Sequence, residues 1–333
     1  MRLFFDPAQL GHDPGQELHN GAWAPHAEHR GRAEAILAAL GPTQTPSDAG
    51  EAPLLRVHPA DYLAFLKSAH DEWRAAGRPG NAIGYTWPVA RRRSLDLSRI
   101  DARLGQYSYD AATPIAAGTW AAAYAGAQAA LAATEAILAA DPCAFALCRP
   151  PGHHCGADYL GGYCYLNNAA IAAQAAIAAG RRVAILDIDY HHGNGTQDIF
   201  YGRGDVLFVS VHADPATDYP FYWGHADETG EGEGEGATLN LPLPQGTGLG
   251  AYRPALALAL ERIARFGADL LIVSYGADTF TGDPISHFAL ETDDYPILAR
   301  DIAGLRLPTA IVMEGGYAVD ALGANVAAFL SGF

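Results

Sequence analysis

The chain has 333 residues, half of them hydrophobic, and its 37 acidic and 21 basic side chains give a formal net charge of −16. This composition excludes an intrinsically disordered chain, which combines few apolar residues with high net charge. An acidic chain is also a poor counterion for phosphates, so we expect no nucleic-acid partner and interpret the one basic run, Arg91–Arg93, as a solvated loop.

Neither the amino-terminal residues nor the longest apolar segment predicts export or membrane insertion. Asp6 and Pro7 interrupt the opening apolar stretch, which is shorter than the ~7 to 15 residue core of a secretory signal. The Ala-rich segment 118–140 contains Gln and Glu and predicts a buried helix. The cysteines lie in one short window without CxxC spacing, which argues against a disulfide framework or a zinc finger; they are Cys143, Cys148, Cys155 and Cys164. We therefore expect a cytoplasmic protein.

Short apolar runs alternate with longer Ala-rich stretches along the chain, which is typical of parallel βαβ units. In chain order, we predict strands at Leu3–Phe5, Phe145–Cys148, Val183–Ile188, Val206–Val211, Thr238–Leu241, Leu270–Ser274 and Ala310–Met313. We predict helices at Arg32–Leu40, Pro59–Ala69, Thr119–Ala140, Leu166–Ala179, Ala251–Phe266, Tyr295–Gly304 and Asp320–Leu330. Because the strand runs are continuously apolar, we expect one α/β domain, residues 1–333, with a mostly parallel central sheet and helices on both faces.

The stretch from about residue 77 to 117 departs from this alternation, because it mixes Arg, Pro and Tyr without a clear period. Loops of more than ~15 residues in compact domains are usually functional or bind partners. This segment contains Tyr85, Trp87, Tyr107 and Tyr109, and aromatic residues together with Arg are enriched in the cores of protein interfaces. We therefore predict an inserted rim loop that contacts a second subunit.

Polar side chains follow four of the predicted strands, and the carboxyl ends of parallel strands form the edge of a sheet at which ligands gather. The side chains concerned are His153, His154, Asp187, Asp189, His191, Asn194, Asp278, Glu314 and Tyr317. Burying carboxylates beside an imidazole costs free energy unless a cation compensates. The cluster therefore predicts a divalent metal ion.

Three of these side chains suit a catalytic metal site. Asp189 and His191 share a direction if their strand stays extended, and Asp278, which follows another strand, can supply a third ligand. Three protein ligands leave an open coordination position, as in catalytic rather than structural zinc sites. Two oxygens and one nitrogen do not distinguish Zn²⁺ from Fe²⁺, Co²⁺ or Mn²⁺ by ligand type alone.

Five motifs occur in the order RPPGHH, GGYCYLNNAA, DIDYHHGNGTQDIFY, GADTFTGDP and EGGY. In this order and spacing they resemble, over essentially the full chain, the histone deacetylase superfamily, and most closely its bacterial acetylpolyamine amidohydrolases. The resemblance implies an arginase-like fold with an eight-stranded, mostly parallel sheet. It also implies a zinc-dependent amidohydrolase of linear amides that removes a short acyl group from a small acetylated amine, such as an acetylated polyamine.

The resemblance assigns roles to the residues at the strand ends. It implies that Asp189, His191 and Asp278 hold the Zn²⁺ ion. It implies that His154 takes a proton from water and returns one to the departing amine, and that Tyr317 stabilises the oxyanion.

The resemblance also implies that the tandem histidines are not equivalent. His153 is backed by Asp187, which favours its imidazolium form. His154 is backed by Asn194, where other family members have Asp, and a neutral amide raises basicity less than a carboxylate does. This difference keeps His154 free to act as a base near neutral pH.

Alkali-cation sites and a substrate tunnel are implied in the same way. An inner potassium site matches Asp187, the Ser210 hydroxyl and the carbonyls of Asp189, His191 and Val211. An outer potassium site matches the carbonyls of Phe200, Arg203 and Val206. A narrow tunnel matches Gly162, Tyr163, Tyr219 and Ile285, where apolar walls bury a methylene chain.

The substrate has an alternative, because polyamine members carry acidic residues in the segment that here spans Leu104–Thr113 and offers only Asp110. That alternative is a protein acetyl-lysine deacetylase. An arginase-like dimanganese hydrolase is disfavoured because Gly276 stands where a second aspartate ligand is expected. An inactive acyl-binding homologue is disfavoured because the ligands, the histidines and Tyr317 are all present. In the resembling amidohydrolases the insertion packs against a second subunit, which implies a twofold homodimer whose loop narrows each tunnel mouth.

Overall fold

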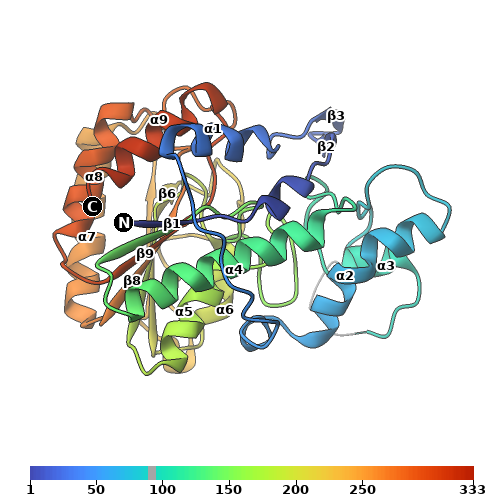
Figure 1. The fold of residues 1–333 in the computed structure, drawn as a ribbon, viewed down its shortest axis with the longest axis horizontal. Helices are drawn as coiled ribbons and strands as arrows, with labels where there is room; N and C mark the ends of the chain where they lie inside the picture. The colour runs from blue at the N-terminus through green and yellow to red at the C-terminus, as the bar shows by residue number, and fades with distance from the viewer. Residues whose placement is uncertain (89–94) are drawn as a thin grey trace.

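The computed structural model describes residues 1–88 and 95–333, and the basic run Arg91–Arg93 lies outside the described residues. Its centre is a seven-stranded sheet in the order β1-β4-β9-β8-β5-β6-β7 (Figure 1). These strands are β1 (Arg2–Phe4), β4 (Cys143–Ala146), β5 (Val183–Asp187), β6 (Val206–Ala213), β7 (Thr238–Leu243), β8 (Leu270–Tyr275) and β9 (Thr309–Met313). Every neighbouring pair in this sheet is parallel, which confirms the predicted α/β class.

The expectation of eight strands is wrong for the described residues. Each of the seven predicted apolar runs forms a strand of the central sheet. The remaining strands, β2 (Gln16–His19) and β3 (Ala22–Pro25), pair only with each other as an antiparallel hairpin. Most of their residues are exposed or half-buried, so they lack the two covered faces that a strand inside a parallel sheet needs.

Helices cover both faces of the sheet, so alternate residues of a strand enter two separate cores (Figure 1). One face carries α1 (Gly31–Leu40), α7 (Leu249–Phe266), α8 (Tyr295–Ala303) and α9 (Val319–Leu330). The other carries α4 (Thr119–Leu138), α5 (Asn168–Ala178) and α6 (Asn194–Phe200). In β5, Leu186 belongs to the first core and Ile185 to the second. Within the described chain, no helix has both the length and the apolar character required to cross a membrane.

A third core lies beside the sheet, where α2 (Ala60–Ala75) packs against the unpredicted short helix α3 (Ile100–Gln106) (Figure 1). Tyr107 is buried in this core, and the half-buried Trp87 donates its Nε1–H to Ser108 Oγ at 3.0 Å. Of the four aromatic residues expected at an interface, only Tyr85 is exposed, at 68%. The segment therefore buries much of its apolar surface against its own subunit, which corrects the premise of an exposed aromatic excursion.

Short 3₁₀ turns complete the described secondary structure; they are η1 (Pro7–Gly11), η2 (Leu54–Arg56), η3 (Gly232–Gly234) and η4 (Thr292–Asp294).

Candidate active site

The three predicted metal ligands lie together at the carboxyl edge of the sheet. Asp189 and His191 follow β5, and Asp278 follows β8, which is the neighbour of β5. Their ligating atoms all lie within 4.8 Å of one another, and all three residues are buried. His191 Nδ1 is 3.4 Å from Asp189 Oδ1 and 3.2 Å from Asp278 Oδ2. Two carboxylates and one imidazole thus converge on one point.

The electrostatics of this cluster favour a cation. Burial and the negative charge of Asp189 raise the pKa of Asp278 to about 7, because two carboxylates share one site shielded from water. The backbone amides of His191 and Gly315 donate to Asp189 at 2.9 and 2.8 Å, and they offset only part of this repulsion. Carboxylate and imidazole donors suit Zn²⁺, Fe²⁺ and Co²⁺, so the residues present fit a divalent metal ion.

Two glycines allow the two carboxylates to approach each other. A Cβ atom at Gly276 would lie 2.0 Å from Asp189 Oδ2, and one at Gly315 would lie 2.3 Å from Asp278 Oδ2. Any side chain at either position would therefore displace a ligand. Gly276 also stands where the dimanganese alternative needs a further carboxylate, and the space for one is already filled.

A second group of potential ligands consists of His153, Cys164 and Glu314, but its carboxylate is already engaged. Glu314 Oε2 accepts from the amides of Gly152 and His153 at 2.6 and 3.1 Å, and Oε1 accepts from the Ser274 hydroxyl at 3.0 Å. Glu314 therefore anchors the loop of the tandem histidines to the end of β9. Glu314 had no predicted role, although a carboxylate directly after a buried strand is a usable signal.

The tandem histidines have different partners and opposite pKa shifts. His153 Nδ1 lies 3.0 Å from Asp187 Oδ2, and His154 Nδ1 lies 2.7 Å from Asn194 Oδ1. Burial lowers the pKa of His153, but the charges of Asp189 and Asp187 outweigh burial and raise it to about 10. Burial, and then the charge of His153, hold the pKa of His154 well below its usual value. Because the Asn194 oxygen only accepts, His154 carries its hydrogen on Nδ1 and keeps a lone pair on Nε2.

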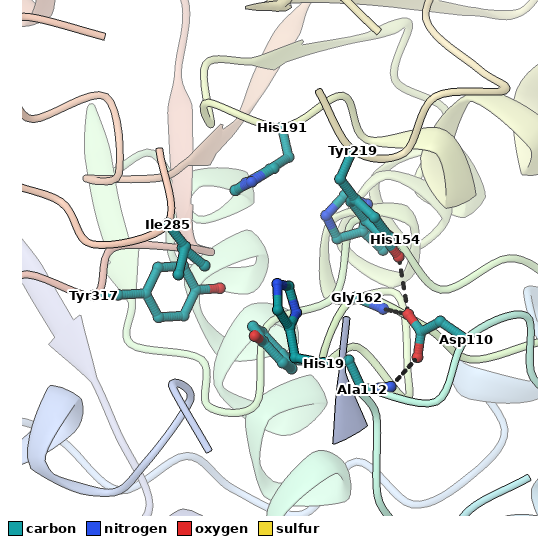
Figure 2. Close-up of a pocket in the computed structure, with 10 residues that line it drawn as sticks. His19, Asp110, Ala112, His154, Gly162, His191, Tyr219, Ile285 and Tyr317 are labelled. Carbon is teal, nitrogen blue, oxygen red and sulfur yellow. Dashed lines mark hydrogen bonds between the residues drawn. The ribbon is translucent and has the colours of Figure 1, made fainter. Parts of the chain in front are cut away.

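A narrow cavity of about 130 Å³ opens beside the metal-ligand cluster (Figure 2). Its walls contain the predicted tunnel residues Gly162, Tyr163, Tyr219 and Ile285, together with His154, His191 and Tyr317. Tyr317 and Ile285 lie on one side, opposite Tyr219 and His154, and the Tyr317 hydroxyl points into the space between them (Figure 2). The ring centroids of Tyr163 and Tyr317 are 5.7 Å apart, in an edge-to-face arrangement. This aromatic enclosure suits a slender, unbranched chain.

Three lining residues, His19, Asp110 and Ala112, had no assigned place in the tunnel. Asp110 Oδ2 accepts from the Gly162 amide at 2.7 Å and from the Tyr219 hydroxyl at 3.0 Å (Figure 2). The Asp110 carboxylate therefore ties two parts of the cavity wall together. His19 belongs to the β2–β3 hairpin, which no local sequence pattern predicted.

Tyr317 packs against a buried cation. The guanidinium of Arg32 lies 4.7 Å from the centroid of the Tyr317 ring. Arg32 also donates to the carbonyls of Gly316 and Glu314, both at 2.6 Å, and pairs with the buried carboxylate of Glu28 at 2.8 Å. No local sequence pattern predicts this contact, because Arg32 stands in an ordinary helix far from Tyr317 along the chain.

The residues predicted for the potassium sites lie around β5 and β6. Asp187 is the register partner of Ser210, whose hydroxyl lies 2.7 Å from His212 Nδ1. Phe200 ends α6, and its carbonyl accepts from the Arg203 amide at 2.9 Å. These positions do not test cation binding, and the potassium sites stay a prediction.

Fold and site together define an α/β protein with a buried Asp–His–Asp cluster at the base of an aromatic cavity. The chain belongs to the histone deacetylase family, since that family's profile, the histone deacetylase domain, matches residues 26–333. The chain is 50% identical to acetylpolyamine amidohydrolase 1 of Pseudomonas aeruginosa, with 100% of this chain and 98% of that protein covered. The resemblance drawn from the five motifs is therefore confirmed.

Solved structures support the same placement. The crystal structure of acetylpolyamine aminohydrolase from Burkholderia pseudomallei has a TM-score of 0.96 at 43% identity, covering 100% of this chain and 98% of that one. The HD domain of HDA15 has a TM-score of 0.81 at 29% identity, covering 99% and 90% respectively. The chain thus shares its fold with an acetylpolyamine aminohydrolase and with the HD domain of HDA15.

Removing a single carboxylate should abolish metal binding. We expect Asp278→Ala and Asp189→Ala to lack the divalent metal that we expect the wild type to bind, because each removes one of three protein ligands. Elemental analysis of the purified proteins measures this directly. Asp301→Ala, which removes a surface partner of Arg253, is the matched control and should keep its metal. Full metal content in Asp278→Ala would exclude this cluster as the site.

Proposed function

We propose that this protein is a metal-dependent amidohydrolase that removes the acetyl group from a small, linear acetylated amine. One arrangement carries the proposal: His154, His191 and Tyr317 face the same narrow cavity, beside a cluster of donors that suits a divalent metal ion. The names of the relatives agree with the reaction, because acetylpolyamine amidohydrolases cleave an amide of this kind.

The chemistry divides between the metal and the side chains. Asp189, His191 and Asp278 would hold a Zn²⁺, Fe²⁺ or Co²⁺ ion, which when bound would lower the pKa of water and polarise an amide carbonyl. His154 Nε2 accepts the proton that water loses on attack, and it returns a proton to the amine nitrogen as the C–N bond breaks. Tyr317 donates its hydroxyl hydrogen to the oxygen that becomes negative.

His153 has a different task from His154. The charges of Asp189 and Asp187 raise the pKa of His153 to about 10 despite burial, which favours its cationic form over a free base. Its positive charge lies 3.8 Å from Asp189 Oδ1 and adjoins the His154 ring, with the two centroids 4.1 Å apart. We assign His153 to electrostatic stabilisation and His154 to proton transfer.

The cavity and the overall charge favour a small cationic amine as substrate. Tyr163, Tyr219 and Ile285 enclose space for a methylene chain, whose burial contributes about 25 cal/mol per Å². A net charge of −16 raises the local concentration of cationic substrates. The second candidate is a protein acetyl-lysine deacetylase. Asp110 favours it, because the Asp110 carboxylate accepts hydrogen bonds from Gly162 and Tyr219 in the cavity wall and is therefore not free to bind the distal ammonium of a polyamine.

Two further features belong to the proposal. Potassium would be held by hard oxygen donors of Asp187, Ser210 and the neighbouring carbonyls, which support the loop after β5. A reducing, cytoplasmic setting agrees with the cysteines, since all four are buried and none forms a disulfide within the described residues.

Substitution of the proton-transfer and oxyanion groups should separate chemistry from metal binding. We expect His154→Ala and Tyr317→Phe each to lower kcat by about 10²-fold or more, with unchanged metal content. Steady-state kinetics with acetylputrescine, paired with elemental analysis, measure both. Tyr222→Phe removes the same hydroxyl from a ring that is 81% exposed, and it should leave kcat unaltered. An unchanged kcat in Tyr317→Phe would mean that another group stabilises the oxyanion.

A substrate panel tests the choice between the two candidate functions. We expect kcat/KM for acetylputrescine, acetylcadaverine and acetylspermidine to exceed that for acetyl-lysine peptides by about tenfold or more. The reason is that a slender chain loses less binding free energy to steric clash at the narrow cavity mouth than a peptide does. Higher kcat/KM for the peptides would instead establish the acetyl-lysine deacetylase.

The homodimer predicted from residues 77–117 can be tested at one exposed ring. We expect light scattering to give twice the chain mass of 35.1 kDa for the native protein. Tyr85→Asp should shift the equilibrium toward monomer, because a charge replaces an aromatic side chain in the contact. Leu258→Asp, at another exposed apolar position on α7, is the control. A monomeric native protein would contradict the dimer.

A further inference from the structure

Asp283 is a buried carboxylate in the GADTFTGDP motif to which the proposed chemistry gives no task. Its side chain is 7% exposed, and it lies on the loop after β8, between the metal ligand Asp278 and the wall residue Ile285. Asp283 Oδ2 accepts from the backbone amides of Tyr317 at 2.6 Å and Ala318 at 3.2 Å. Its Oδ1 accepts from the Ile285 amide at 3.1 Å. One carboxylate thus holds three amides from two loops.

These amides belong to the part of the chain that carries the oxyanion donor. Residues 314–318 follow β9 without regular secondary structure, so no helix or strand ladder fixes the Tyr317 backbone. The Arg32 guanidinium binds two carbonyls of this loop, and Asp283 binds two of its amides. The carbonyls of the loop are therefore held by the Arg32 cation, and its amides are held by the Asp283 carboxylate.

We propose that Asp283 is a positioning residue that fixes the Tyr317 hydroxyl for its contact with the oxyanion. The inference rests on the proposed function, in which Tyr317 supplies that hydrogen bond. Asp283 also accepts from the Ile285 amide, and Ile285 lies beside Tyr317 in the cavity wall (Figure 2), so Asp283 sets Tyr317 relative to this part of the wall. A displacement of about 1 Å at a reacting group can cost 10²-fold in rate, so a backbone anchor here controls kcat.

The geometry separates this role from direct participation. Within the described residues, Asp283 accepts hydrogen bonds from backbone amides alone, and it does not line the cavity. It also lies outside the Asp189–His191–Asp278 cluster. Asp283 therefore acts through Tyr317 rather than on the substrate or the metal.

The kinetic test compares two variants of Asp283 with a control variant of Asp6, a carboxylate that also accepts from a backbone amide but lies near the surface. We expect Asp283→Ala to lower kcat by about 10- to 10²-fold with KM changed less than about twofold, because the cavity stays open while the oxyanion contact is displaced. Asp283→Asn keeps one acceptor oxygen, so its decrease in kcat should be smaller. Asp6→Asn alters a carboxylate that caps the Ala8 amide, and its kcat should match the wild type. Melting temperatures and metal contents verify that each variant is folded and loaded.

A double-mutant cycle and hydrogen exchange complete the test. In a Tyr317→Phe background, Asp283→Ala should lower kcat by less than about threefold, because the group it positions is already absent. Amide exchange measured on the peptide that spans residues 314–319 should accelerate in Asp283→Ala and not in Asp6→Asn. Unchanged exchange, or a full additional kcat loss in the Tyr317→Phe background, would overturn the proposal. If exchange accelerates but Tyr317→Phe itself keeps wild-type kcat, Asp283 anchors the loop but Tyr317 does not stabilise the oxyanion. In that case the oxyanion role in the proposed function fails, and the positioning role of Asp283 in catalysis is overturned with it.

Discussion

Mutual repulsion between Asp189 and Asp278 is the constraint on which the rest of the site depends. Parallel pairing of β5 with β8 delivers both carboxylates to the same buried edge, where water cannot screen them. Three features of the surroundings compensate this negative charge. The raised pKa of His153 favours its cationic form, backbone amides donate to Asp189, and the ligand set suits a divalent metal ion. The acid–base difference between the two histidines follows in part, because burial and then the charge of His153 lower the pKa of His154.

Carboxylates also organise the loops around this centre. Glu314 accepts from the amides of Gly152 and His153, Asp110 joins Gly162 to Tyr219, and Asp283 accepts from the Tyr317 amide. Each accepts from groups of two different segments of the chain, so loops without regular structure acquire a defined relation to the rigid sheet. Precision at the site thus comes from buried anions at strand ends and loop bases, and only indirectly from the helices.

Much of this arrangement could be predicted from the sequence, because parallel strands and their polar exits are local patterns. The seven apolar runs all became strands, and the residues that follow them meet at one edge, as for Asp189 and Asp278. Contacts that join distant segments left no such trace. Arg32 and Gly316 are 284 positions apart, and Asp283 and Tyr317 are 34 positions apart. Short α3 escaped prediction because its seven residues present too few turns for a helical period.

The close packing at Gly276 bears on how such a site can change over evolutionary time. A Cβ placed there lies only 2.0 Å from Asp189 Oδ2 and 2.6 Å from Asp278 Oδ1, so a carboxylate added at this position would push both ligand side chains aside. A lineage that acquired a further metal ligand here would pass through an intermediate that had lost its original ligand geometry. A second metal ion at this position therefore requires coupled changes at Gly276 and at the ligands it adjoins, rather than the exchange of one side chain.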